Sequence, residues 1–168
     1  MSTVQARFGK LPWLGLSVLV LAADQVSKAA ISAHLGLYDS VSVLPVFNLV
    51  LLHNPGAAFS FLAGQPGWQR WFFTVLALVI TAGIVLWLWR LRDAGRRWLA
   101  CALALVAGGA LGNVVDRIRF GYVVDFIQVH YQHWYYPAFN VADSAITVGA
   151  IMLLLDGFLR QHRAAGVK

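Results

Sequence analysis

Four long apolar stretches decide what this chain can fold into. They cover about residues 11–33, 71–91, 98–115 and 139–159. Each comes close to the roughly 20 residues that an α-helix needs to cross the hydrocarbon core of a bilayer. We therefore predict an all-α membrane protein with four transmembrane helices. No linker or shift in composition divides the chain, so we predict a single integral membrane domain over residues 1–168.

The composition favours burial in lipid over burial in a soluble core. Hydrophobic residues make up 60% of the chain and charged residues only 12%, about half the charged share of ordinary soluble domains. A soluble domain of this size has too little interior to hide so much apolar surface. The single cysteine, Cys101, excludes a disulfide framework and a cysteine-rich metal site. An internal repeat of the kind that builds many transporters is not evident.

The basic residues predict how the chain is oriented in the membrane. Two precede the first apolar stretch, four crowd the connection between the second and third, and three follow the fourth. These nine of the 13 lysines and arginines lie on one side of a four-span protein: Arg7, Lys10, Arg90, Arg92, Arg96, Arg97, Arg160, Arg163 and Lys168. The positive-inside rule places that side, with both termini, in the cytoplasm. The net charge of +6 is therefore a topology signal, and no nucleic-acid partner is expected.

The segment between spans one and two has a pattern of its own. Residues 41–49 mix β-branched and apolar side chains in partial alternation around Pro45, which predicts a small periplasmic β-sheet of one or two short strands. A turn is expected at residues 53–56 and a short interfacial helix at residues 57–62. Aromatic residues in both outward segments fit an interfacial belt: Trp68, Trp71, Phe72, Tyr131, Trp134, Tyr135 and Tyr136.

The acidic residues are the candidates for function, and all seven are aspartates. Four of them lie within or beside the outer ends of the spans: Asp24, Asp116, Asp125 and Asp143. An ionisable group at that depth is costly and marks a candidate functional site. Asp24 can pair with Lys28, one helical turn further on. Asp116 can be neutralised by Arg117 or Arg119, so both of these acids also have a structural explanation.

Asp125 and Asp143 have no cation at helical spacing, and both are expected near the outer membrane surface. Two carboxyl groups that face each other in a poorly solvated site cannot both ionise easily, so the pair holds one proton. The ionised member can activate a water molecule, and the protonated member can donate to a scissile carbonyl group. That is the arrangement of the aspartic peptidases.

Three other classes of protein also fit parts of the pattern. Intramembrane aspartates serve proton and ion pathways, so a small proton- or ion-coupled transporter is the main alternative. A serine peptidase could use Ser144 with His53, His130 or His133, although no Gly-x-Ser-x-Gly motif is present. A metallopeptidase is disfavoured because the chain has no His-Glu-x-x-His motif and no glutamate. No metal and no cofactor are predicted.

Five blocks of the sequence closely resemble the lipoprotein signal peptidase family, also called signal peptidase II. They are residues 24–28 (DQVSK), 54–59 (NPGAAF), 108–117 (GGALGNVVDR), 121–126 (GYVVDF) and 139–144 (FNVADS). The resemblance covers nearly the whole chain, in order, with the family's length and four-span layout. Each block alone is a weak signal, but the five together are highly specific.

The resemblance implies a site and a substrate. The catalytic pair would be Asp125 and Asp143. Supporting or substrate-binding roles would fall to Asp24, Lys28, Asn54, Gly56, Asn113, Asp116, Arg117 and Asn140. The substrates would be diacylglyceryl-modified prolipoproteins in the bacterial inner membrane, cut just before the lipidated cysteine near the periplasmic face. Membrane lipid would be the other partner, and the enzyme is expected to be a monomer.

Overall fold

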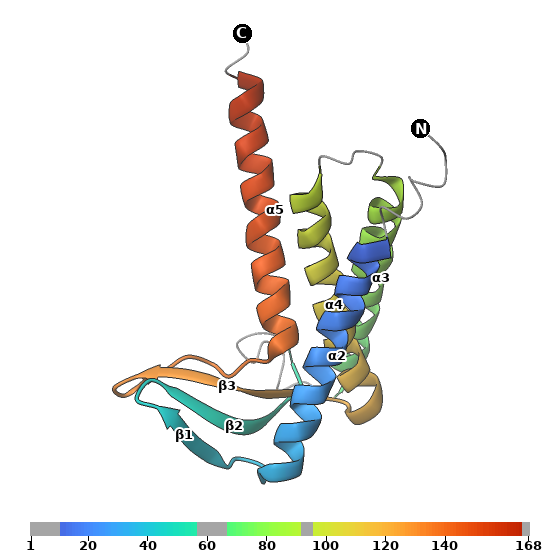
Figure 1. Ribbon diagram of the computed structural model, residues 1–168. Helices are drawn as coiled ribbons and strands as arrows, with labels where there is room; N and C mark the ends of the chain where they lie inside the picture. Colours follow the sequence, from blue (N-terminus) through green and yellow to red (C-terminus); the bar gives the residue numbers. More distant parts are fainter. Residues whose placement is uncertain (1–10, 57–66, 92–95, 166–168) are drawn as a thin grey trace.

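Four long helices form a bundle in the computed structural model, and a small antiparallel sheet lies at one end of it (Figure 1). The structure describes residues 11–56, 67–91 and 96–165. The helices are α2 (Leu11–His34), α3 (Trp68–Arg90), α4 (Arg97–Phe120) and α5 (Val141–Ala165). Each of these four is long and apolar enough to cross a membrane. The predicted four-span architecture is therefore confirmed.

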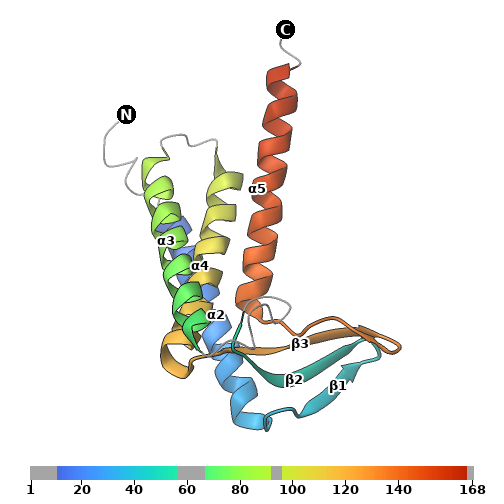
Figure 2. The same ribbon diagram turned by 180° about the vertical axis from the view of Figure 1, so that it is seen from behind.

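Helix α4 lies at the centre of the bundle, and small residues let its neighbours approach closely. About two thirds of its apolar window is buried, at 67%, against 17–22% for the other three helices. A Cβ atom added at Gly108 would lie 2.5 Å from the Ser17 carbonyl oxygen of α2, and one at Gly109 would fall against the Ala142 carbonyl oxygen of α5. Close backbone contact of this kind is how helices associate in lipid. Figure 2 shows α3 beside α4 from behind.

The third helix is longer than the apolar stretch predicts. The stretch ends near residue 115, but α4 continues to Phe120 and stops where Gly121 takes the left-handed conformation, with φ 87°. Glycine adopts this conformation without steric cost, so it is a natural helix end. Asp116 and Arg117 consequently lie on the last turns of α4 instead of in the outward segment.

The sheet has four strands in the order β1-β2-β3-β4: β1 (Ser40–Leu44), β2 (Phe47–Asn54), β3 (Val123–Tyr131) and β4 (Trp134–Tyr135). The predicted break at Pro45 is confirmed, because it falls between β1 and β2. The expectation that the sheet lies wholly between spans one and two is wrong, since β3 and β4 come from the second outward segment. The predicted turn begins later than expected because β2 includes residues 53 and 54. The expected interfacial helix at residues 57–62 lies outside the described residues.

The sheet spreads sideways from one end of the bundle, where α2 ends and α5 begins (Figure 1). Strand β3 follows α4 directly and pairs with β2, with Leu52 opposite Asp125. This pairing carries β3 across the bundle end toward the start of α5, and Phe139, just before that helix, forms a bridge with Ile127. Both predicted catalytic aspartates are thereby placed at the junction of sheet and bundle.

Candidate active site

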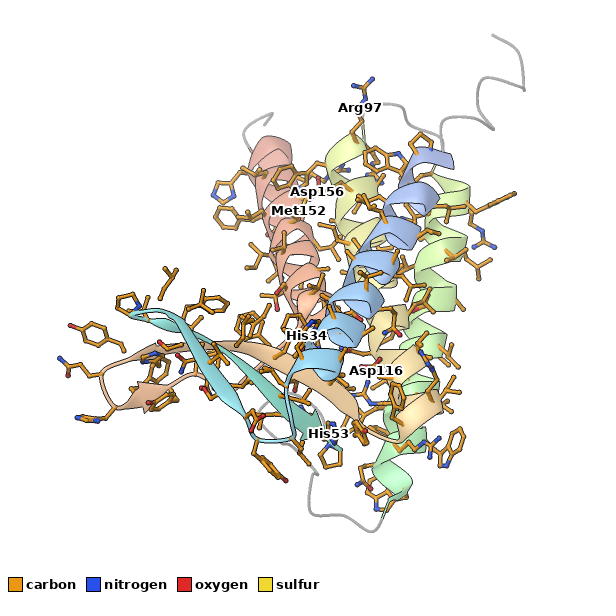
Figure 3. All side chains as sticks on the ribbon, turned by 60° about the horizontal axis from the view of Figure 1, so that its bottom comes forward. His34, His53, Arg97, Asp116, Met152 and Asp156 are labelled. Carbon is orange, nitrogen blue, oxygen red and sulfur yellow. The ribbon has the colours of Figure 1, made fainter. Side chains whose placement is uncertain are left out.

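All ten predicted site residues meet at this junction, and hydrogen bonds or ion pairs connect them into one network. Helix α2 contributes two, the end of β2 and the next turn contribute two, α4 contributes three, β3 contributes one, and the start of α5 contributes two. They are Asp24, Lys28, Asn54, Gly56, Asn113, Asp116, Arg117, Asp125, Asn140 and Asp143. Figure 3 shows Asp116 and His53 at this end of the molecule, with Arg97 and Asp156 at the other.

Asn140 links the two candidate catalytic acids. Its side-chain Nδ2 donates to Oδ1 of Asp125 at 2.7 Å, and its Oδ1 accepts the backbone N–H of Asp143 at 2.8 Å. The backbone N–H of Asn140 donates in turn to Oδ2 of Asp143 at 3.3 Å. This reciprocal pair is a capping box at the N-terminus of α5. The same local motif that begins the helix therefore fixes Asp143 relative to Asp125.

Asn54 and Asn113 complete the set of amides around the two acids. Asn54 donates from Nδ2 to Oδ2 of Asp125 at 3.0 Å, and its Oδ1 accepts the N–H of Gly56 at 3.0 Å. Asn113 donates from Nδ2 to Oδ1 of Asp143 at 2.7 Å. All four carboxyl oxygens of the pair thus accept a hydrogen bond. Donors arranged in this way stabilise an ionised carboxylate.

The surroundings of Asp125 strongly perturb its ionisation. Burial, followed by the nearby charge of Asp143, raises the pKa of Asp125 from its ordinary value of 3.8 to about 7, although the hydrogen bonds from Asn54 and Asn140 and the charge of Lys28 act to lower it. Asp125 as a whole is only 3% exposed. A carboxyl group that titrates near neutral pH is suited to give and take protons in catalysis.

A buried ion cluster of Asp24, Lys28 and Asp116 is linked to the candidate catalytic pair through Asn113. Nζ of Lys28 is 2.8 Å from Oδ2 of Asp24 and 2.8 Å from Oδ2 of Asp116. The predicted pairing of Asp24 with Lys28 is confirmed. The expected partner of Asp116 was Arg117 or Arg119, but its ion-pair partner is Lys28, and the charge of Arg117 acts on it only from a greater distance. Consecutive helical residues point about 100° apart, so Arg117 is directed elsewhere.

The two arginines at the end of α4 have other partners. Arg117 is buried and donates from its guanidinium to the carbonyl oxygen of Gly56 at 3.0 Å, which ties α4 to the turn after β2. Its guanidinium carbon also lies 5.4 Å from the ring centroid of Phe73. Arg119 is exposed, with its guanidinium carbon 4.9 Å from the ring centroid of Phe120.

Gln25 is a member of the network that the sequence did not single out. Its Nε2 lies 2.8 Å from Oδ1 of Asp116, 3.2 Å from Oδ2 of Asp24 and 3.2 Å from the Gly112 carbonyl oxygen. Neighbouring positions on a helix do not share a face, so helical periodicity does not predict that Gln25 and Asp24 act together. The one available signal was its place inside the block at residues 24–28.

The groups of the alternative serine mechanism are engaged elsewhere. Oγ of Ser144 donates to the carbonyl oxygen of Asn140 at 2.9 Å, as a helical side chain commonly does. The ring of His53 stacks on Tyr122 with centroids 3.8 Å apart, and His130 stacks on Tyr135. Burial lowers the pKa of His53. These contacts favour the aspartate pair over a serine and histidine pair.

Known peptidases are similar to this chain over most of its length. A family model described as signal peptidase (SPase) II matches residues 16–159. The lipoprotein signal peptidase of Pseudomonas aeruginosa is 60% identical over 154 residues, which cover 90% of each chain. That of Pseudomonas fluorescens is 57% identical over 160 residues, which cover 94% of each chain.

Solved structures agree with the fold. One, described as a bacterial membrane enzyme at 2.3 Å resolution, is 30% identical, has a TM-score of 0.79 and matches 89% of each chain. A second, at 1.9 Å resolution, is 32% identical, has a TM-score of 0.73 and matches 86% of this chain and 91% of that one. The chain therefore belongs to the signal peptidase II family of membrane peptidases.

Proposed function

We propose that this chain is an aspartyl endopeptidase that removes the signal peptide from diacylglyceryl-modified prolipoproteins, cutting just before the lipidated cysteine. The observation that carries the proposal is the pair of acids joined by Asn140, with Asp125 buried on β3 and Asp143 in the first turn of α5. The names of the relatives support the substrate class. They do not support the alternative of a small ion-coupled transporter.

The proposed chemistry uses the shared proton of the pair. The ionised carboxylate removes a proton from a water molecule, whose oxygen attacks the scissile carbonyl carbon. The protonated carboxyl group donates its proton to the carbonyl oxygen, which gives a neutral tetrahedral diol. When the C–N bond breaks, one member of the pair donates its proton to the leaving amine and the other takes a proton from a diol hydroxyl group. The new carboxyl and amino termini separate, and the pair again holds one proton. The macroscopic titration steps belong to the pair and not to either residue alone.

The proposed placement is a multi-pass protein of the bacterial inner membrane with its active site near the periplasmic face. The sheet end of the bundle holds the candidate site, and nine of the 13 lysines and arginines lie in the parts of the sequence at or beyond the opposite ends of the helices. A signal peptide that lies in the bilayer as a helix would present its cleavage site at the depth of the pair. Exposed apolar side chains on α2 and α5, such as Val26 and Leu154, face the surrounding lipid in this arrangement.

The decisive experiment compares two precursors with the same peptide sequence, one with and one without the diacylglyceryl group. Lipid held between the spans would fix the scissile bond against the pair, and such positioning lowers reaction barriers by several kcal/mol. We expect the purified protein to cut the lipidated precursor far faster, and to do so in the presence of EDTA. Mass spectrometry of the product should show the lipidated cysteine as the new N-terminus. Equal cleavage of both precursors, or activity that depends on added zinc, would contradict the proposal.

A further inference from the structure

We infer that Lys28 is a positioning residue for the catalytic pair: it holds in place the two chain segments that carry Asp125 and Asp143 and turns the amide of Asn113 toward Asp143. The inference rests on the proposed function, because it concerns how that pair is arranged. It assigns to Lys28 more than neutralisation of two buried carboxylates.

The ammonium group of Lys28 uses every donor that it has. An ammonium group has three N–H bonds and no acceptor. Here the three acceptors are Oδ2 of Asp24 at 2.8 Å, Oδ2 of Asp116 at 2.8 Å and Oδ1 of Asn113 at 3.1 Å. Lys28 is 3% exposed. A buried charge is tolerated only when it is paired and hydrogen-bonded in this way, so the three contacts fix the ammonium group firmly.

The first consequence concerns α5. The second oxygen of Asp24, Oδ1, accepts the backbone N–H of Ala142 at 2.9 Å. Ala142 lies in the first turn of α5, where backbone N–H groups have no partner inside the helix, and it directly precedes Asp143. Through Asp24, Lys28 therefore ties α2 to the backbone beside one member of the pair.

The second consequence concerns β3, where Asp116 has the same role that Asp24 has at α5. Oδ2 of Asp116, which also contacts Lys28, accepts the backbone N–H of Val124 at 3.1 Å. Val124 directly precedes Asp125. One ammonium group thus binds two carboxylates, and each carboxylate binds the peptide N–H just before one of the two catalytic acids. The position of Lys28 sets how far apart those two backbone segments lie.

The third consequence concerns the orientation of an amide. Because Lys28 can only donate, Oδ1 of Asn113 must face it, and Nδ2 of Asn113 must then face Oδ1 of Asp143, at 2.7 Å. Nδ2 of Asn140 supplies a longer second contact to Oδ1 of Asn113, at 3.3 Å. Without Lys28 only the longer contact from Asn140 holds the amide of Asn113 in this orientation. A rotated amide would bring its oxygen toward Asp143, where it would disfavour the ionised carboxylate.

The test separates positioning from neutralisation. Removing Lys28 alone leaves two facing carboxylates, so the informative variant is the neutral cluster Lys28→Met, Asp24→Asn and Asp116→Asn. The amide oxygens of the two new asparagines can still accept the N–H groups of Ala142 and Val124, and no buried charge is left unpaired. If Lys28 served only to neutralise, this variant would keep the wild-type kcat.

We expect the neutral cluster to melt within a few degrees of the wild type and to keep its KM for the lipidated precursor. Its kcat should fall roughly 10- to 100-fold, the effect of losing one charge-assisted hydrogen bond to the pair. The acidic limb of its pH–rate profile should move to higher pH, because the ionised pair has lost a donor and Asp125 has lost the nearby charge of Lys28, which lowers its pKa. The neutral cluster leaves Asp125 and Asp143 themselves unchanged, and it also leaves Arg117, the other charged group close to them.

A matched control and a second variant complete the design. Arg160→Met removes an ion pair of the same spacing and length, Asp156 to Arg160 at 2.8 Å, from the far end of α5. It should leave kcat unchanged. Asn113→Ala alters no charge and should lower kcat by a similar factor to the neutral cluster. Adding Asn113→Ala to the neutral cluster should lower kcat little further, because both changes act through the same hydrogen bond from Asn113 to Asp143.

The outcomes distinguish this inference from the proposed function. A folded neutral cluster with wild-type kcat and pH profile would overturn the role of Lys28 while the wild-type enzyme still cleaves its substrate. Wild-type kcat in Asn113→Ala would overturn it as well, even if the neutral cluster failed to fold. A wild-type protein that does not cut the lipidated precursor would instead contradict the proposed function itself.

Discussion

At the scale of single residues, three asparagines give the pair its chemical character. In each one Oδ1 faces a group that can only donate: the N–H of Gly56 for Asn54, Nζ of Lys28 for Asn113, and the N–H of Asp143 for Asn140. Each Nδ2 must therefore point to a carboxyl oxygen of the pair. Burial opposes ionisation of the pair and these donors favour it, so a site that holds one proton is stable at neutral pH.

The first prediction concerns the two acids. Asp125→Asn and Asp143→Asn preserve size but remove an ionisable group, so each should abolish turnover while binding of the lipidated precursor and thermal stability stay close to the wild type. The double variant should cost little beyond either single one, because the two act as a unit. Asp156→Asn, at the other end of the bundle, is the control and should keep full activity. Substantial turnover by either single variant in a well-folded sample would rule out the catalytic pair.

The second prediction follows from the raised pKa of Asp125, from 3.8 to about 7. Between these pH values the folded chain keeps a proton that the unfolded chain releases, so its stability decreases as the pH rises from about 4 to about 7 and then levels off. The asparagine in Asp125→Asn cannot ionise, so this variant does not lose stability in this way as the pH rises. Its Tm relative to the wild type should therefore be higher at about pH 8 than at about pH 4.5, by several degrees at roughly 2–4 °C per kcal/mol. An equal Tm difference at both pH values would contradict the perturbed ionisation.

At the scale of elements, the helices were predictable and the sheet was predictable only in part. A bilayer demands long apolar helices, so hydropathy alone places all four. Strand β3 depends on pairing with β2, about 70 residues earlier in the chain, and its run of apolar and aromatic residues fits an interfacial anchor equally well. The last turns of α4 were missed because its apolar pattern ends before the helix does.

The candidate site was predictable for a related reason. Its members are acids, a lysine and asparagines at depths where such residues are costly, so they stand out against an apolar chain. Their connections were less predictable. The contact of Lys28 with Asp116 joins α2 to α4 across 88 positions of sequence (116 minus 28), and helical spacing carries no information about such a contact. Gln25 was missed for the same reason.

The third prediction concerns the contact between α4 and α5. A Cβ atom at Gly109 would fall against the carbonyl oxygen of Ala142 and lie 2.9 Å from Cγ1 of Ile146. Gly109→Ala should therefore destabilise the protein by about 1–3 kcal/mol, as overpacking does, and lower kcat because Ala142 directly precedes Asp143. Gly83→Ala on α3, where a Cβ atom meets open space, is the matched control. Thermal unfolding and turnover should separate the two, and identical behaviour would disprove the close packing.

At the scale of the whole molecule, the fold separates chemistry from anchorage. The candidate site and the sheet occupy one end of the bundle, whereas α2 begins and α5 ends at the other (Figure 1). Helix α4 is buried by its three neighbours, and their outer faces carry exposed apolar side chains such as Leu19, Val79 and Leu154. The proposed peptide hydrolysis, which needs water, would therefore take place at one rim of the bundle, the sheet end, while the outer faces of the helices contact lipid. The orientation of that rim decides where the reaction takes place.

The last prediction is therefore the orientation. Nine of the 13 basic residues lie before α2, from the last residue of α3 to the first residue of α4, or toward and beyond the end of α5. The positive-inside rule places those regions in the cytoplasm. Reporter fusions at Gly95 and at the C-terminus should both read cytoplasmic. A fusion at Gln132, between β3 and β4, should read periplasmic, because the sheet lies at the opposite end of the bundle. A periplasmic signal at the C-terminus would contradict the four-span topology. A cytoplasmic signal at Gln132 would place the candidate site on the wrong side for substrates whose lipidated cysteine lies at the outer face.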